Sequence, residues 1–386
     1  MTLSSALAWL AALSWGWMLL LRGRFWLIER PARAPEPEQW PAVAVAIPAR
    51  NEAGVISATV RSLLGQDYAG PLRIVVTDDH STDDTARIVT ETAAAMNASD
   101  RVLVVESHPL PQGWSGKLWA QSQAVEAAVT AFPDTSLLLL GDADIEHAPD
   151  QLRHMVARLL AEGSDMASLM VRLSTETLAE RLIIPAFVFF FRLLYPFRWV
   201  NEPLRRTAAA AGGYILIRRA MLEQIGGLAA IGGALIDDCT LAARVKAAAG
   251  RITLHLAETT RSTRVYKGFD GLWMMIARSA YTQLRCSPLL LAGTVAAMTI
   301  AFLLPPLFVL AGGPARCPAL LAWAAMSLAF APMLRFYRLP MAWAPGLPLV
   351  ALFYLAATID SARRHMEGRG GEWKGRVQAG SDAGRN

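Results

Sequence analysis

The chain has 386 residues, of which 54% are hydrophobic, with a mean hydropathy of +0.32 and a formal net charge of +5. This composition is too apolar for an ordinary soluble enzyme and predicts one sizeable globular domain together with membrane segments. No face with interleaved basic and aromatic residues is visible in the sequence, so we expect no nucleic-acid partner. The three cysteines lack C-x-x-C spacing, which argues against a disulfide framework and a zinc site.

The amino-terminal segment predicts a membrane anchor over residues 1–28. Residues 1–21 carry no charge, are rich in Leu, Ala and Trp, and are long enough to span a bilayer. The basic residues follow this apolar run, whereas a cleaved signal peptide carries them before it. We therefore expect an uncleaved anchor whose carboxyl end faces the cytoplasm, followed by a Pro-rich linker over 29–41.

Residues 42–286 alternate between buried strands and helices, which predicts an α/β domain with a doubly wound, mostly parallel sheet. The predicted strands are 43–47, 72–76, 101–106, 137–140, 166–170, 214–217 and 252–257, and the main helices are 55–64, 116–131, 149–160 and 240–249. In open α/β sheets, ligands bind beyond the carboxyl ends of the strands. The polar residues that follow these strands are therefore the candidate site residues.

Paired carboxylates occur at three such places. Asp78-Asp79 ends the second strand, Asp142-x-Asp144 follows the fourth, and Asp237-Asp238 precedes the helix 240–249. Each pair alone could be a solvated turn or a helix cap, because carboxylates are favoured at helix amino ends. Their order, with Lys117 between the first two pairs, favours nucleotide-sugar chemistry over these structural roles.

The Asp142-x-Asp144 pair is the candidate metal site. Two carboxylates one residue apart can share a divalent cation, and their oxygen ligands suit Mg²⁺ or Mn²⁺. Such a cation would hold the diphosphate of a nucleotide and stabilise it as a leaving group. Lys117 could add positive charge at the phosphates, and a later carboxylate could act as general base on an acceptor hydroxyl.

Two further regions bear on the membrane. The segment 182–200 is rich in aromatic residues and interrupted by arginines and prolines, which favours a helix lying in the membrane interface; a core helix of the globular domain is the alternative. Residues 287–360 predict three membrane segments before a basic tail over 361–386. Three full spans would leave that tail outside, against the positive-inside tendency, so we expect the first segment, with Pro305-Pro306, to be re-entrant or broken.

Several stretches of the chain resemble known families. Four of them resemble successive motifs of family 2 glycosyltransferases: 48–52 (PARNE), 77–85 (TDDHSTDDT), 142–144 (DAD) and 237–238 (DD). Four more are similar to the hopene-associated glycosyltransferases of bacterial hopanoid gene clusters: 111–119 (PQGWSGKLW), 184–191 (IPAFVFFF), 207–213 (TAAAAGG) and 277–285 (ARSAYTQLR). The resemblance covers nearly the whole chain and implies a GT-A fold and inversion at the anomeric centre.

By position, the resemblance also implies roles for individual residues. The implied donor-binding residues are Pro48, Arg50, Glu52, Asp79, Lys117 and Asp142. Asp79 would contact the uracil, and Asp142 and Asp144 would bind the ribose, the metal and the diphosphate. Asp238, next to Asp237, would be the general base. The family's Q-x-x-R-W motif is absent, with Arg278 alone in that region, which argues against a polysaccharide synthase.

The expected function is therefore transfer of a sugar from a nucleotide sugar, expected to be a UDP-sugar, to a membrane lipid, with a hopanoid as the acceptor that the resemblance implies. Transfer to polyprenyl phosphate, a nucleotidyltransferase reaction and a catalytically silent membrane scaffold are the alternatives. We expect a multi-pass protein of the inner membrane whose catalytic domain faces the cytoplasm.

Overall fold

The computed structural model describes residues 2–30, 32–373 and 376–377, and it falls into two compact units. The sheet unit contains the described residues of 31–174, 199–264 and 372–386; the membrane-helix unit contains those of 1–30, together with 175–198 and 265–371. Residues 175–198 and 265–286, which the sequence placed in the catalytic domain, group with the membrane-helix unit. Met1, Pro31 and, apart from residues 376–377, the predicted basic tail after Trp373 lie outside the described residues.

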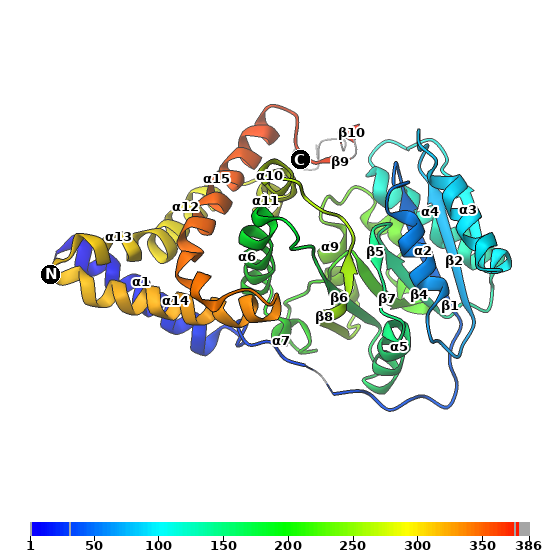
Figure 1. Cartoon of the computed structure of the whole chain (residues 1–386), viewed down its shortest axis with the longest axis horizontal. Helices are drawn as coiled ribbons and strands as arrows, with labels where there is room; N and C mark the ends of the chain where they lie inside the picture. Colours follow the sequence, from blue (N-terminus) through cyan, green and yellow to red (C-terminus); the bar gives the residue numbers. More distant parts are fainter. Residues whose placement is uncertain (1, 31, 374–375, 378–386) are drawn as a thin grey trace. The chain divides into compact units, whose positions relative to one another are not determined.

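The sheet unit is built on an eight-stranded sheet with the order β3-β2-β1-β4-β7-β6-β8-β5 (Figure 1). The strands are β1 (Val43–Ala49), β2 (Leu72–Asp78), β3 (Val102–Glu106), β4 (Leu137–Gly141), β5 (Ile145–Glu146), β6 (Met166–Arg172), β7 (Tyr214–Arg218) and β8 (Ile252–Ser262). Strands β1, β2, β3 and β4 pair in parallel, as do β6 and β8, whereas β7 runs antiparallel to both of its neighbours. A short antiparallel pair, β9 (Glu372–Trp373) and β10 (Arg376–Val377), forms a separate sheet.

Helices cover the sheet because its strands are apolar on both faces, as parallel α/β sheets require. The helices of this unit are α2 (Ile56–Leu64), α3 (Thr85–Ala95), η1 (Ser99–Arg101), α4 (Gly116–Ala131), α5 (Gln151–Ala161), α8 (Arg219–Gln224), η2 (Leu228–Ile231) and α9 (Asp237–Ala247). Alternate residues of β1, such as Val45 and Ile47, join the core cluster that contains Ile56 of α2 and Val156 of α5. Helix α4 packs against β1 and β2.

Two boundaries differ from the predicted ones in ways that matter for the site. Helix α9 begins at Asp237 itself, not at Thr240, so both acids of this pair lie in its first turn. Strand β8 continues to Ser262, five residues beyond its predicted end, because Ser262 and Arg261 pair with β5. The extension brings the chain after β8 beside the Asp142-x-Asp144 turn.

Among the residues that the structure describes, the membrane-helix unit contains four helical stretches that are long and apolar enough to cross a membrane: Leu3–Leu21, Pro288–Ala311, Gly313–Phe336 and Met341–Met366. They comprise α1 (Leu3–Leu21), α12 (Pro288–Met298), η3 (Thr299–Leu303), α13 (Leu304–Ala311), η4 (Gly313–Ala315), α14 (Arg316–Phe336), η5 (Met341–Gly346) and α15 (Leu347–Met366). One is amino-terminal and three are carboxy-terminal, in agreement with the sequence.

The first carboxy-terminal stretch is irregular at its centre. Helix α12 passes into the π-helical segment η3 before α13, whose first turn contains Pro305 and Pro306. Proline has no backbone N–H and clashes with the preceding turn, so a local change of hydrogen-bonding pattern before a proline pair is expected. The stretch nevertheless remains helical over Pro288–Ala311.

The aromatic segment predicted at 182–200 forms α6 (Leu178–Leu194) and α7 (Phe197–Val200). Helix α6 begins with a capping box between Thr177 and Glu180, and Pro185 is accommodated within it. Its rings pack against the apolar helices of the same unit, with Phe189 5.3 Å from Phe330 and Phe190 4.8 Å from Tyr354 between ring centroids. Two further helices of this unit are α10 (Phe269–Ala277) and α11 (Ala280–Gln283).

Candidate active site

The Asp142-x-Asp144 turn lies at the end of β4, in the middle of the sheet. All five residues of β4 are buried, and the strand lies between β1 and β7. The residue that follows β8 contacts this turn. Thr263 donates from both its backbone N and its Oγ1 to the carbonyl oxygen of Asp144, at 2.8 and 3.0 Å. Asp144 is therefore held through its backbone carbonyl, by contacts that do not use its carboxylate.

Lys117 joins two of the three acidic pairs. It lies in the first turn of α4, which Ser115 caps by accepting from the backbone N of Leu118. Its Nζ lies 2.9 Å from Asp142 Oδ1 and 3.2 Å from Asp237 Oδ2. Burial alone would lower the pKa of Lys117, but the charges of Asp142 and Asp237 raise it above its usual value, so the ammonium stays protonated.

Asp142 is subject to opposing effects. Burial raises the pKa of its carboxyl, Lys117 lowers it, and the neighbouring Asp144 raises it again, with a net shift upward, although a third of the side chain (33%) remains exposed. Positive charge delivered to this turn would therefore stabilise the ionised form, which is what a site for a divalent cation requires.

Asp238 is positioned by two backbone donors. The N–H of Gly212 donates to Asp238 Oδ2 at 3.0 Å, and the N–H of Cys239 donates to Oδ1 at 2.7 Å. Burial and the adjacent Asp237 raise the pKa of Asp238 to about 6, against the lowering effects of Lys117 and these N–H groups. A carboxylate with a pKa near the working pH is suited to accept a proton in catalysis.

Gly212 permits this close arrangement. A Cβ at this position would lie 3.2 Å from Lys117 Nζ and 3.6 Å from Asp238 Oδ2. Any larger residue would therefore push against the lysine that joins the acidic pairs. Because the segment 207–213 entered the sequence analysis only through a resemblance, no role was predicted for this glycine.

A second basic residue contacts the other aspartate of the turn. Arg264 Nε lies 2.6 Å from Asp144 Oδ2, and its Nη2 lies 3.0 and 3.3 Å from the two carboxylate oxygens of Glu52. Asp144 and Glu52 are buried, with 8% and 9% exposed. The sequence analysis did not identify Arg264, because it follows a part of β8 that is longer than the apolar pattern indicated.

The first acidic pair lies where β1 and β2 end. Asp79, 1% exposed, donates its backbone N–H to the carbonyl of Ala49, and Arg50 lies 3.6 Å from its carboxylate. Pro48 is the sixth residue of β1 and pairs in register with Thr77 of β2. Among the described residues, Arg50 Nε and Asp78 Oδ1 are buried without a hydrogen-bond partner. Unpaired buried groups of this kind at a strand end are candidates for ligand contacts.

The structure thus arranges the candidate residues in three groups within the sheet unit. Lys117 connects Asp142 with Asp237, and Arg264 connects Asp144 with Glu52; the one-residue spacing of the aspartates places these two groups next to each other. The remaining predicted residues, Pro48, Arg50 and Asp79, share the adjacent strand ends. Arg278 is the carboxy-terminal cap residue of α10 in the membrane-helix unit and is exposed.

The donor set suits a cation that arrives together with a diphosphate. Among the described residues, no group of three or more His, Cys, Asp and Glu side chains could by itself hold a metal ion. Mg²⁺ is commonly bound by one or two protein carboxylates together with substrate phosphates and water. Asp142 and Asp144 can supply those two carboxylates, so the residues present fit such a cation.

Comparison with known proteins agrees with this geometry. Residues 44–226 match the model of the glycosyl transferase family 2. An N-acetylglucosaminyltransferase of Mesorhizobium japonicum is 30% identical over 152 residues, or 39% of this chain and 33% of that protein. One of a Rhizobium species is 31% identical over 163 residues, or 40% and 34%. The match therefore spans about a third of the length of these two curated relatives.

One solved structure is similar over nearly the full length. It is a mannosyltransferase from Pyrobaculum calidifontis in complex with GDP-Man and Mn²⁺, with a TM-score of 0.56, 21% identity, and coverage of 94% of this chain and 99% of that one. This likeness shows the fold, which is GT-A-like, as the sequence predicted. The family match thus covers residues 44–226 of the chain, and the likeness to the solved structure concerns the fold.

Proposed function

We propose that the protein transfers a sugar from a nucleotide diphosphate sugar to a hydroxyl group of a membrane lipid, with inversion at the anomeric carbon. The single observation that carries this proposal is the position of Lys117, which contacts one carboxylate of the Asp142-x-Asp144 turn and one of the Asp237-Asp238 pair. A residue suited to charge stabilisation at a diphosphate and a residue suited to proton removal thereby belong to one cluster.

The proposed reaction is a single displacement. Asp238 accepts the proton of the acceptor hydroxyl at its carboxylate, whose backbone contacts with Gly212 and Cys239 fix its orientation. The acceptor oxygen forms a bond to the anomeric carbon as the bond from that carbon to the diphosphate oxygen breaks, and the nucleoside diphosphate leaves with its electron pair. Lys117 stabilises the negative charge that develops on the diphosphate. A Mg²⁺ or Mn²⁺ ion bound by Asp142 and Asp144 would contribute further charge neutralisation there.

The ends of β1 and β2 are proposed to bind the nucleoside. Arg50 and Asp78 each present a buried polar atom without a partner among the described residues. Asp79 directly follows Asp78, and its carboxylate lies 3.6 Å from Arg50. A base and a ribose offer the donors and acceptors that would satisfy such atoms. We propose UDP as the nucleotide from the resemblance; the structurally similar mannosyltransferase was solved with GDP-Man, so GDP is the alternative to be tested.

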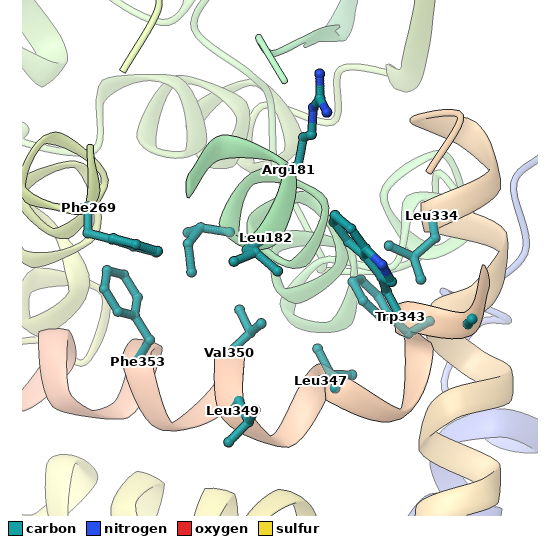
Figure 2. Close-up of a pocket in the computed structure, with 13 residues that line it drawn as sticks. Arg181, Leu182, Phe269, Leu334, Trp343, Leu347, Leu349, Val350 and Phe353 are labelled. Atoms are coloured by element: carbon teal, nitrogen blue, oxygen red, sulfur yellow. The ribbon is translucent and has the colours of Figure 1, made fainter. Parts of the chain in front are cut away.

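A lipid acceptor is proposed from the membrane-helix unit. This unit contains a pocket of about 420 Å³, within the usual range for small-molecule sites. Its lining comes from α6, α10, α14, η5 and α15 and is apolar except for Arg181 (Figure 2). Phe269 and Phe353 lie on one side of the pocket, and Trp343 and Leu334 on the other (Figure 2). We propose that the hydrocarbon part of the acceptor occupies this pocket.

A hopanoid is the acceptor that the resemblance favours. Polyprenyl phosphate is the second candidate, because Arg181, the one charged residue among those that line the pocket, could meet a phosphate. Product chemistry separates the two: a sugar linked through phosphate is released by mild acid, whereas an ether-type glycoside resists.

The test is a comparison of lipid extracts from cells with and without this gene by mass spectrometry, together with nucleotide release by the purified protein. The proposal predicts a lipid that loses a hexose or aminosugar increment when the gene is absent, and release of UDP or GDP that depends on that lipid. Release of pyrophosphate would instead indicate a nucleotidyltransferase, and no nucleotide release with any candidate lipid would indicate a catalytically silent scaffold.

A further inference from the structure

The two aspartates of the Asp142-x-Asp144 turn are each held by a different basic side chain. Lys117 contacts Asp142, and Arg264 contacts Asp144. A divalent cation that uses both carboxylates must therefore enter a place where each already has a positive partner. The two basic residues differ in exposure: the side chain of Lys117 is 20% exposed, whereas that of Arg264 is 38% exposed. The side chains of Glu52 and Asp144, which Arg264 contacts, are buried.

We propose that Arg264 is a diphosphate-binding residue that exchanges the carboxylate of Asp144 for phosphate oxygens when donor and cation bind. This inference rests on the proposed function, because it assumes that the diphosphate lies at the Asp142-x-Asp144 turn. A guanidinium group has a planar set of donors that matches phosphate oxygens in pairs, as it matches a carboxylate. It can therefore move from one anion to the other without losing its hydrogen bonds.

In this exchange, Asp144 and Arg264 each keep a partner of opposite charge. Asp144 loses a guanidinium and gains a divalent cation, while Arg264 loses one carboxylate and gains a phosphate. Glu52, which accepts from Nη2, can remain in contact and keep the guanidinium close to the turn. The backbone of the preceding residue, Thr263, stays bonded to the carbonyl of Asp144, so only the arginine side chain needs to move.

This arrangement predicts coupled binding. Without nucleotide, a cation competes with Arg264 for Asp144 and binds weakly. When the diphosphate is present, Arg264 has a new partner and Asp144 is released for the cation. Cation and nucleotide therefore each strengthen the binding of the other, and the coupling is reciprocal.

The experiment is calorimetric titration of the full-length protein with Mn²⁺ alone, and with UDP and GDP at zero and saturating Mn²⁺. The variants are Arg264→Gln and Arg264→Lys, with Arg261→Gln as the matched control. Arg261 lies three residues earlier and forms an ion pair with Glu146 at 2.8 Å, outside the turn. Thermal unfolding of each variant confirms that it is folded.

For Arg264→Gln, we expect binding of Mn²⁺ alone to strengthen about threefold to tenfold. We expect nucleotide binding at saturating Mn²⁺ to weaken about tenfold to a hundredfold, the range for loss of hydrogen bonds to a charged group. Arg264→Lys should keep Mn²⁺ binding near that of the unchanged protein and lose less nucleotide affinity. Arg261→Gln should alter neither. If Arg264→Gln does not fold, the lysine variant alone decides between these patterns.

Two outcomes would overturn the inference: parallel weakening of Mn²⁺ and nucleotide binding in the Arg264 variants, which would indicate a structural ion pair, or no change in either. Asp144→Asn separates this failure from failure of the proposed function. If Asp144→Asn loses Mn²⁺-dependent nucleotide binding while the Arg264 variants behave as structural ones, the donor site stands and only the exchange is wrong. If Asp144→Asn binds Mn²⁺ and nucleotide normally, the donor site itself is misplaced.

Discussion

The ammonium group of Lys117 lies 3.2 Å from the carboxylate of Asp237, and this contact joins the first turn of α4 to the first turn of α9. Lys117 and Asp237 are far apart in sequence, and each lies in the first turn of its own helix. The same ammonium contacts Asp142, so one side chain neutralises carboxylates from two segments.

Removal of this charge should affect both stability and donor binding. In Lys117→Met, Asp142 and Asp237 face each other without a cation, so we expect the free energy of unfolding at pH 7 to fall by about 1–3 kcal/mol, less than for a fully buried pair. Nucleotide affinity should fall about tenfold. Lys117→Arg keeps the positive charge, so we expect smaller losses of unfolding free energy and of nucleotide affinity in this variant. Chemical denaturation and calorimetry measure the two effects, and a Met variant with unchanged nucleotide affinity would contradict the assigned role.

A methyl group at Gly212 should disturb the same cluster. The new Cβ would lie 3.2 Å from Lys117 Nζ, so the lysine must shift away from the acidic pairs. We expect Gly212→Ala to lower kcat by about tenfold or more, since small displacements of catalytic groups are costly, with little effect on thermal unfolding. Gly54→Ala is the matched control in the same unit, because no heavy atom lies within 4 Å of its added Cβ. Equal kcat values for the two variants would show that the close approach is not functional.

The activity should depend on pH through Asp238. Its pKa is raised to about 6 by burial and by Asp237, and the group must be ionised to accept a proton. We therefore expect kcat/KM to be constant above about pH 7 and to decline tenfold per pH unit well below pH 6. Steady-state kinetics over a pH range of about 4.5 to 8.5, which spans this pKa, would show the decline. A profile that is flat down to pH 5 would contradict the assignment of the base.

The proposed acceptor pocket can be tested with two leucines on α15. Leu349 lines the pocket and is 75% exposed; Leu352 is 51% exposed and is not among the lining residues. Both substitutions to Trp retain apolar character, but only Leu349→Trp places a larger side chain in the pocket. We expect KM for the lipid acceptor to rise about threefold to tenfold in Leu349→Trp alone, with nucleotide binding unchanged. Equal effects of the two variants would place the acceptor elsewhere.

The sequence predicted those parts of the site that depend on local pattern. Apolar runs that stop at polar residues identified β1, β2 and β4, and the carboxylates that follow them lie where the sheet rule places ligands. The pattern also singled out Lys117 and the Asp237-Asp238 pair, and the resemblance implied their roles. The structure confirms the fold class, and the roles of these residues remain predictions.

The remaining features depend on pairing between distant segments, which local pattern does not specify. Arg264 reaches Asp144 because β8 continues past its apolar part to pair with β5, a two-residue strand with no signal of its own. The close approach at Gly212 depends on β7 entering the sheet antiparallel to β4. Neither the antiparallel strand nor its register follows from hydrophobic periodicity.

The central claim concerns Asp238, and Asp238→Asn isolates its chemistry. The amide keeps the shape of the side chain and an acceptor for the N–H of Gly212, so nucleotide binding should persist. The variant should also be stable. A raised carboxyl pKa contributes stability only at low pH, and this contribution is lost as the pH rises through about 6. At pH 7 the neutral amide therefore avoids the cost of ionising this buried carboxyl, but its NH₂ group loses the hydrogen bond from one of the two backbone N–H donors. Because these two effects oppose each other, we expect the free energy of unfolding to change by less than about 2 kcal/mol.

The most direct test is single-turnover transfer from labelled nucleotide sugar to the lipid acceptor by Asp238→Asn, beside nucleotide affinity measured on the same preparation. The account predicts nucleotide affinity within about threefold of the unchanged protein and transfer slower by about 10²–10⁴-fold. Transfer at a near-normal rate by this variant, with nucleotide still bound, would show that another group removes the acceptor proton.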